Sequence, residues 1–419
     1  MRDSLGVPAR VPCCERARGI DVVPAFLSWI DFSSADRERM RRAFALFQER
    51  ETRDELGLGT IRDAFADTLY PGTSTIQTRL RYFLFVPWMY RELERAGVGS
   101  EEVARRARKA ETDLIFVLLE SGDTSGVIGK VAGRDVQRLP SSIYWAGLST
   151  WGICLFAGSQ DQYHRQLDAL RKLRRRGEDP DDAGVAREAH ATWHPRLPDP
   201  PSTWPKQAEF AVRRSEAEFL KGRITTMCAG SMLAWLAEHG RAGELDDPAL
   251  YSSALPERLR EQLDLARRFA LVTHGAAWLY NLMLAELAGR DDWVEYHREG
   301  LREWADGPEA VDLRTFDPDE LWRFVEDARA NVPPPTRRFV REWVGLMHEH
   351  DPGKLGDIAA ARELVRLRER ALKGSRSRFT NRRALDQWTG ASGTGRFNYR
   401  WHVVQRLLED LHVGLASDD

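Results

Sequence analysis

The chain has 419 residues, of which 42% are hydrophobic and 30% charged, with 14 Trp and 17 Phe. This balance is typical of a folded globular protein and excludes an intrinsically disordered chain. The 62 Lys and Arg residues against 64 Asp and Glu leave a formal charge of −2. No overall field therefore points to a nucleic acid or a membrane. The length allows two domains of roughly 150–200 residues.

The cysteines indicate a reducing compartment. Cys13 and Cys14 are adjacent, whereas Cys154 and Cys228 lie far apart, so there is neither a CxxC pair nor a disulfide framework. Reduced thiols are typical of a cytoplasmic protein, and we expect Cys154 and Cys228 to be small core residues.

Two segments bear on targeting. Residues 1–20 contain Arg and Glu but no apolar stretch, so we expect no secretory signal. The uncharged run 139–160 contains Pro140 and several Gly and Ser residues. Its apolar core is shorter than the roughly 20 residues that a membrane span needs. We expect a buried helix there and no membrane partner.

Helical periodicity dominates the first half. We expect a loose leader over 1–25 and a helical domain over 26–176. The proline at position 87 is expected to kink the helix that contains it. Helices are predicted at about 35–50, 60–69, 74–95, 101–120, 142–157 and 160–175.

The second half is predicted to be helical as well. Residues 177–206 are rich in proline and read as a linker or loop. A second helical domain is expected over 207–373, and a basic, aromatic C-terminal unit over 374–419. The fold class is thus mainly α, with two helical subdomains joined by a Pro-rich loop. Further helices are predicted at about 207–239, 256–288, 291–305, 317–331, 334–349, 357–372 and 403–415.

Common catalytic motifs are absent or incomplete. Gly129-Lys130 lacks the upstream glycine and the following Ser or Thr of a phosphate-binding loop. His190 and His194 have the spacing of two ligands on a helix, but they lie in a Pro-rich stretch. His348 and His350 lie at a polar helix end, where the helix dipole favours histidine. We expect no metal and no cofactor.

Residues 60–86 have the outline of a helix-turn-helix, with Pro71-Gly72 as the turn and polar residues opening the second helix at Ser74. The run from Tyr82 to Tyr90 must be buried, so only the first turns could reach a nucleic acid. We favour a structural helical hairpin and keep Arg79 as a candidate contact.

A basic window near the C-terminus gives the strongest indication of a partner. Residues 361–406 contain twelve basic and three acidic residues, a net charge of +9, so the rest of the chain carries −11. Eleven of the twelve are arginines, which bind phosphate in bidentate fashion and stack on bases. Five aromatic residues lie between them, as on single-strand stacking platforms. Alternatively, the arginines pair with acidic residues of the same chain and the aromatics fill a core. The candidate nucleic-acid-binding residues are Arg376, Arg378, Arg382, Arg383, Arg396, Arg400, Trp401 and Arg79.

Several stretches resemble a bacterial family of unknown function. They are SWIDFSSADRERMRRAFALF, DELGLGTIRDAFAD, YPGTSTIQTRLRYFLFVPWMY, SSIYWAGLSTWGI and FNYRWHVVQRLLEDLHVGL. The resemblance runs from about Phe26 to Leu415 and leaves the leader outside. It supplies no catalytic residues. It implies gene neighbours among helicases and DNA-modifying enzymes in phage-defence loci.

Three functions remain open. The preferred hypothesis is a non-enzymatic accessory protein that binds DNA or RNA, or a helicase or DNA-modifying enzyme, through the basic window. The first alternative is a nuclease-like enzyme whose Asp, Glu and His residues meet only in the fold. The second is a protein–protein scaffold, in which the arginines would already be paired.

Overall fold

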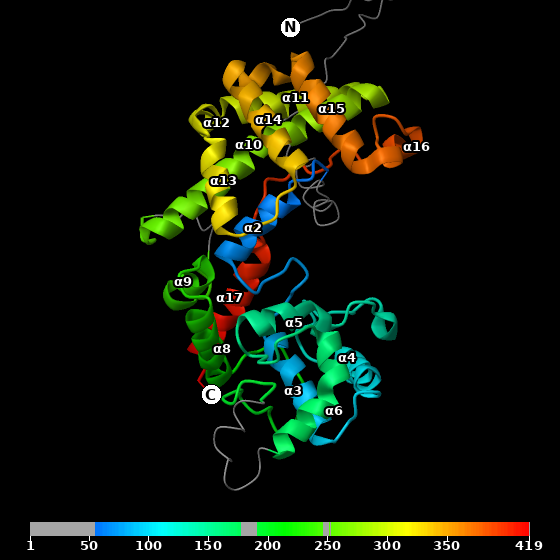
Figure 1. Ribbon diagram of the computed structural model, residues 1–419, viewed down its shortest axis with the longest axis vertical. Helices are drawn as coiled ribbons and strands as arrows, with labels where there is room; N and C mark the ends of the chain where they lie inside the picture. Colours follow the sequence, from blue (N-terminus) through cyan, green and yellow to red (C-terminus); the bar gives the residue numbers. More distant parts are fainter. Residues whose placement is uncertain (1–54, 177–190, 246–250, 252, 419) are drawn as a thin grey trace, which may run out of the picture. The chain divides into compact units, whose positions relative to one another are not determined.

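The computed structural model describes residues 55–176, 191–245, 251 and 253–418, which are mainly α-helical and contain no strand (Figure 1). An isolated antiparallel bridge joins Cys154 to Trp193. The leader and the helix predicted at 35–50 lie outside the described residues, as do Cys13, Cys14, His190 and the first part of the Pro-rich segment.

The first helices follow the predicted order. The helices at 60–69, 101–120 and 160–175 are confirmed. The helix predicted at 142–157 is buried as expected but ends at Thr150, so its predicted end is wrong. Beyond it, Gly152 has a φ of +62°, a left-handed conformation that favours glycine. The bounds are α2 Gly59–Leu69, α3 Tyr82–Arg95, α4 Val103–Leu119, the 3-10 helix η1 Gly133–Asp135, α5 Pro140–Thr150 and α6 Gln160–Arg176.

The helix predicted from about residue 74 begins only at Tyr82, so that predicted start is wrong. The backbone N–H groups of residues 78 and 79 donate to the Tyr144 hydroxyl, at 2.8 and 3.1 Å. The next N–H group donates to Asp410 Oδ2 at 2.9 Å. Because side chains from distant elements satisfy these donors, they do not enter a helical turn. A helix-turn-helix with its second helix starting at Ser74 is therefore not formed.

The second half consists almost entirely of helices. The bounds are α8 Arg214–Met227, α9 Met232–His239, α10 Glu257–Ala288, α11 Asp291–Asp306, α12 Ala310–Thr315, α13 Pro318–Asp327, α14 Pro334–Glu349, η3 Pro352–Asp357, α15 Ala359–Lys373, η4 Gly374–Arg376, α16 Arg382–Asp386 and α17 Trp401–Ala416.

The single helix predicted over 207–239 is wrong, because the chain breaks between α8 and α9. Gly230 has a φ of +78°, and the Ser231 side chain accepts a hydrogen bond from the N–H of Ala234. A serine at this position caps a new helix. The break lets two short helices, rather than one long one, pack against α17.

The 32-residue helix α10 packs against α2, α11 and α15. Gly275 lets α10 pack closely on α11, because an added Cβ atom would lie 2.3 Å from the Trp304 ring. On another side, the Phe65 ring of α2 lies 5.8 Å from that of Phe269 in α10. The buried faces of these helices form one apolar core.

The described part of the Pro-rich segment is attached to the first helices. Leu155 N donates to Thr192 O, and His194 N donates to Ile153 O, both at 2.9 Å. The Trp88 indole donates to Pro198 O at 2.7 Å. The division of the chain into domains stays a prediction. In the described residues, no helix is both long enough and apolar enough to cross a bilayer.

We expect Asp410→Ala to lower the free energy of unfolding by about 3–5 kcal/mol, since it leaves the buried Arg79 guanidinium without its main partner. Arg79 Nε lies 3.0 Å from Asp410 Oδ2, and both side chains are about 10% exposed. Urea denaturation would measure the loss.

The matched control is Asp123→Ala, because Asp123 also contacts Arg79 but is 53% exposed. We expect a loss within about 1 kcal/mol there. Equal losses in the two variants would show that burial does not set the strength of these pairs.

Candidate nucleic-acid interface

The chain turns sharply between α15 and α16. Asn381 Nδ2 donates to Ser375 O at 2.9 Å, and Asn381 N donates to Ser377 O at 2.8 Å. The Asn381 side chain also accepts from Ala384 N and caps α16. These bonds make residues 374–386 one compact turn. We call this turn, together with Arg370 in the last turn of α15, the basic corner.

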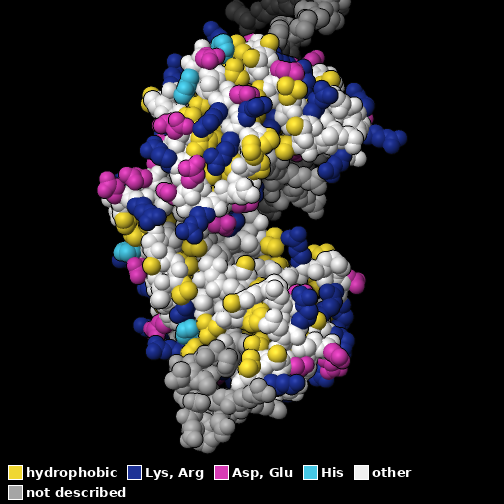
Figure 2. Space-filling view, in the orientation of Figure 1, with side chains coloured by type: hydrophobic (Ala, Val, Ile, Leu, Met, Phe, Trp, Pro, Cys, Tyr) yellow, Lys and Arg dark blue, Asp and Glu magenta, His cyan; other side chains and the backbone are white. Residues whose placement is uncertain are grey.

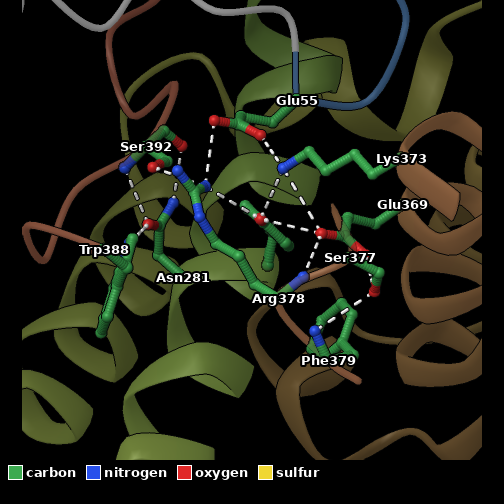
Figure 3. A network of polar contacts seen from close by, with 10 residues as sticks. Glu55, Asn281, Glu369, Lys373, Ser377, Arg378, Phe379, Trp388 and Ser392 are labelled. Atoms are coloured by element: carbon green, nitrogen blue, oxygen red, sulfur yellow. Dashed lines mark hydrogen bonds and ion pairs between the residues drawn. The ribbon is translucent and has the colours of Figure 1, made fainter. Parts of the chain in front are cut away.

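A buried carboxylate fixes the start of the basic corner. Glu369 is fully buried, and its oxygens accept from the Ser377 hydroxyl and from Arg378 N, the latter at 2.9 Å. Lys373 Nζ lies 3.4 Å from Glu369 Oε1. Figure 3 shows Ser377, Arg378 and Lys373 gathered around this carboxylate. Buried charges are stable only when they are paired and hydrogen-bonded, as here.

A second buried carboxylate, Glu55, forms ion pairs with basic side chains of this region. Arg378 Nη1 donates to Glu55 Oε1 at 3.0 Å and to the hydroxyls of Tyr280 (3.1 Å) and Ser392 (2.9 Å). Lys373 Nζ binds the other Glu55 oxygen. Burial alone would lower the pKa of the Arg378 guanidinium, but its contacts with Tyr280 and Glu55 outweigh burial and raise it. Arg378 therefore stays charged and faces the protein interior.

Of the five aromatic residues of the basic window, Trp388 and Tyr399 belong to the core, and the other three are partly buried and pack against it. Trp388 Nε1 donates to Asn281 Oδ1 at 3.1 Å, and the same oxygen accepts from Ser392 N at 2.8 Å (Figure 3). Asn281 Nδ2 in turn donates to Ser392 O at 2.8 Å. The Tyr399 hydroxyl donates to Ala266 O at 2.6 Å. Trp388 and Tyr399 are buried, so neither offers a ring face on which a base could stack.

Three other predicted contacts are occupied within the chain. Arg400, 12% exposed, donates to Asp67 Oδ1 at 2.6 Å and also to Thr73 O. Arg396 Nη1 donates to Glu309 Oε2 at 2.5 Å. The buried Arg79 binds Asp410 and Asp123.

Trp401 is partly buried, and its ring centroid lies 6.0 Å from that of Tyr70.

Four arginines of the basic corner face solvent. Arg376 and Arg383 are exposed and have no carboxylate partner among the described residues. Arg370 is exposed in the same way. Arg382 is 72% exposed and contacts Asp386 at 2.9 Å. Figure 2 shows Lys and Arg side chains gathered over α16.

Residues 24–414 match the family of unknown function DUF6361. The chain belongs to this family. No curated protein and no solved structure matches it. The family resemblance predicted from the sequence motifs is thus confirmed, and any function of this DUF6361 chain must be argued from its own residues.

The cysteines of this DUF6361 chain have the properties of core residues. Cys154 and Cys228 are buried and free, as predicted. Burial raises the pKa of both thiols to about 11, so neither is a thiolate at neutral pH.

The histidines predicted as weak metal candidates are not gathered into a site. His194 accepts from Arg196 N at 3.1 Å through Nδ1, and His348 and His350 are exposed at the end of α14. In the part of the chain that the structure describes, no group of three or more His, Cys, Asp or Glu residues is placed to hold a metal ion.

Sequence reasoning selected Arg378 and Arg400, which are internal, and did not select Arg370. The only local signal for Arg370 is its place in the last turn of α15, where a cation is favoured by the helix dipole. Nothing near Arg378 in sequence reveals Glu55 as its partner, because the two residues are 323 positions apart.

We expect Arg378→Ala to lower the free energy of unfolding by about 3–5 kcal/mol, because it leaves Glu55 partly unpaired in a buried site. Arg383→Ala, which removes an exposed side chain, should change it by no more than about 0.5 kcal/mol. Urea denaturation of both variants measures the difference. Similar values would contradict the assignment of Arg378 to the interior and Arg383 to the surface.

Proposed function

We propose that this protein is a cytoplasmic, non-enzymatic accessory protein that binds DNA or RNA by the phosphate backbone. Its binding surface is the basic corner. The observation that carries the proposal is that Arg370, Arg376 and Arg383 are exposed without carboxylate partners among the described residues. Arginine forms strong bidentate hydrogen bonds with phosphate, and these contacts dominate the affinity of most nucleic-acid-binding proteins.

The buried network supports this proposal by holding the corner in one shape. Glu369 binds the backbone and side chains at the start of the turn, and Asn381 ties η4 to α16. Arginines carried on a rigid turn lose less conformational entropy on binding than arginines on a mobile tail. A partner helicase or DNA-modifying enzyme would be brought to the same nucleic acid.

A protein–protein scaffold is the second candidate, and the pairing of Arg378, Arg396 and Arg400 with acidic residues favours it. In that case the basic corner would dock on an acidic partner protein. A nuclease-like enzyme has less support, since the described residues contain no cluster of ligands for a catalytic metal.

The test is fluorescence anisotropy with labelled single- and double-stranded DNA and RNA over a salt series. We expect the variant Arg370→Gln, Arg376→Gln, Arg383→Gln to bind duplex DNA at least tenfold more weakly at low salt. The slope of log K against log salt should fall in magnitude by roughly 2 to 3, since each lost phosphate contact removes about 0.9.

The matched control is Arg258→Gln, Arg260→Gln, Arg314→Gln, which removes the same charge from exposed positions elsewhere. It should keep most of the affinity. Equal losses in the two variants would point to net charge rather than to the basic corner. No binding by the folded wild-type protein at low salt would overturn the proposal in favour of the scaffold.

A further inference from the structure

A pocket separate from the basic corner lies between α4 and α6. Its volume is about 230 Å³, and its walls include Ala104, Ala107 and Leu139 beside several polar side chains. Drug-sized ligands occupy pockets of roughly 300–1,000 Å³, so this one suits a smaller molecule. The walls offer both apolar contact for an alkyl chain and polar groups for a charged end.

The polar wall contains a buried carboxylate, Glu111, which is 1% exposed. Its oxygens accept from Ser141 N at 2.7 Å and from the Ser141 hydroxyl at 2.8 Å. No Lys, Arg or His in the described residues lies within salt-bridge distance of it. Arg108, one turn earlier on α4, donates instead to Val136 O at 3.0 Å and to Arg134 O.

Gln160 fixes the hydrogen-bond directions around the pocket. Its Nε2 donates to the Ser141 hydroxyl at 2.7 Å and to the Tyr90 hydroxyl at 2.8 Å. The Ser141 hydrogen is thereby directed to Glu111, and the Tyr90 hydrogen to His164 Nε2 at 2.8 Å. Both hydrogens of the Gln160 amide nitrogen are used in these bonds, so none is left for Glu111.

Among the other groups around Glu111, Arg108 is the one that adds positive charge: it also lines the pocket and lowers the pKa of Glu111, but it lies beyond salt-bridge distance. Burial lowers the pKa of His164, against the influence of Asp161, so the imidazole is neutral at neutral pH. Burial raises the pKa of Tyr82 and of Tyr90, which stay uncharged. Asp161, at the pocket wall, is a second carboxylate and pairs with Arg165 at 2.7 Å. Two carboxylates, Glu111 and Asp161, and one guanidinium, Arg108, therefore line the pocket.

We propose that this pocket binds a small organic cation, a primary ammonium group on a short alkyl chain, with Glu111 as its counter-ion. A buried carboxylate is stable in its charged form only beside a cation or several hydrogen-bond donors. The ammonium group supplies both, and the alkyl chain contacts the alanine and leucine wall. A divalent metal ion would need more ligands than the described residues group together.

Binding of the ammonium group is expected to strengthen as the pH rises. Burial raises the pKa of Glu111 to about 7, although the Ser141 bonds and then Arg108 lower it. The ammonium group is charged on both sides of this value, because alkylamines titrate near pH 10. Binding therefore needs the ionised carboxylate, which is present above pH 7 and lost below it. Protonation of His164 at acid pH would weaken binding in the same direction.

The test is saturation-transfer NMR with n-butylammonium as the probe, and butyrate and butanol as controls of the same chain length. We expect butylammonium to bind at pH 8 and about tenfold more weakly at pH 6, following the ionised fraction of Glu111. Butyrate and butanol should not compete with it. Equal binding of the three probes, no binding of butylammonium, or binding that does not change with pH would overturn the proposal.

Glu111→Gln should abolish butylammonium binding at pH 8. Its control is Asp113→Asn on the same helix, where the carboxylate contacts Lys109 and Arg134 outside the pocket. Binding retained by a folded Glu111→Gln variant would reject Glu111 as the counter-ion. If Glu111→Gln does not fold, the pH and probe series with the wild-type protein still decide.

Discussion

The buried carboxylate of Glu369 determines where the chain goes after α15. It accepts from the Ser377 hydroxyl and from Arg378 N, and so turns the backbone back toward α10. Arg378 then reaches Glu55 and Ser392. Two buried carboxylates are balanced by two cations, Lys373 and Arg378, whose side chains are partly buried. If one of the four were removed, the other three would be left with an uncompensated charge. These buried contacts therefore hold in place the turn that carries the solvent-facing arginines.

Local sequence signals were sufficient to predict the bounds of a helix where residues at its own ends determine where it starts and stops. The helices at 160–175, 256–288 and 334–349 were predicted nearly to their ends, the second because Gly289 closes it in a left-handed conformation. Local signals failed where side chains from distant parts of the sequence determine the backbone conformation. The Tyr144 hydroxyl and Asp410 satisfy the N–H groups of residues 78–80, and no window of neighbouring residues contains that information.

The same limit applies to the candidate interface, because its sequence does not reveal which arginines are exposed. A net charge of +9 in the basic window counts every arginine equally, but the fold divides them into two populations. Arg378 and Arg400 neutralise carboxylates from the first part of the described chain, whereas Arg376 and Arg383 face water. The aromatic spacing was equally ambiguous, because a stacking platform and a core both need large rings. Only the partners of each side chain separate the two.

Polar contacts of very long sequence separation have a consequence for synthesis on the ribosome. Arg79 pairs with Asp410 across 331 positions, and Arg368 donates to Leu56 O across 312. At about 5–20 residues per second, the early partners wait on the order of 15–65 s for the late ones to be made. During that time Arg79 and the N–H group of Leu80 lack Asp410, to which both donate hydrogen bonds in the folded protein. The first helices therefore cannot reach their final packing until α17 has left the ribosome.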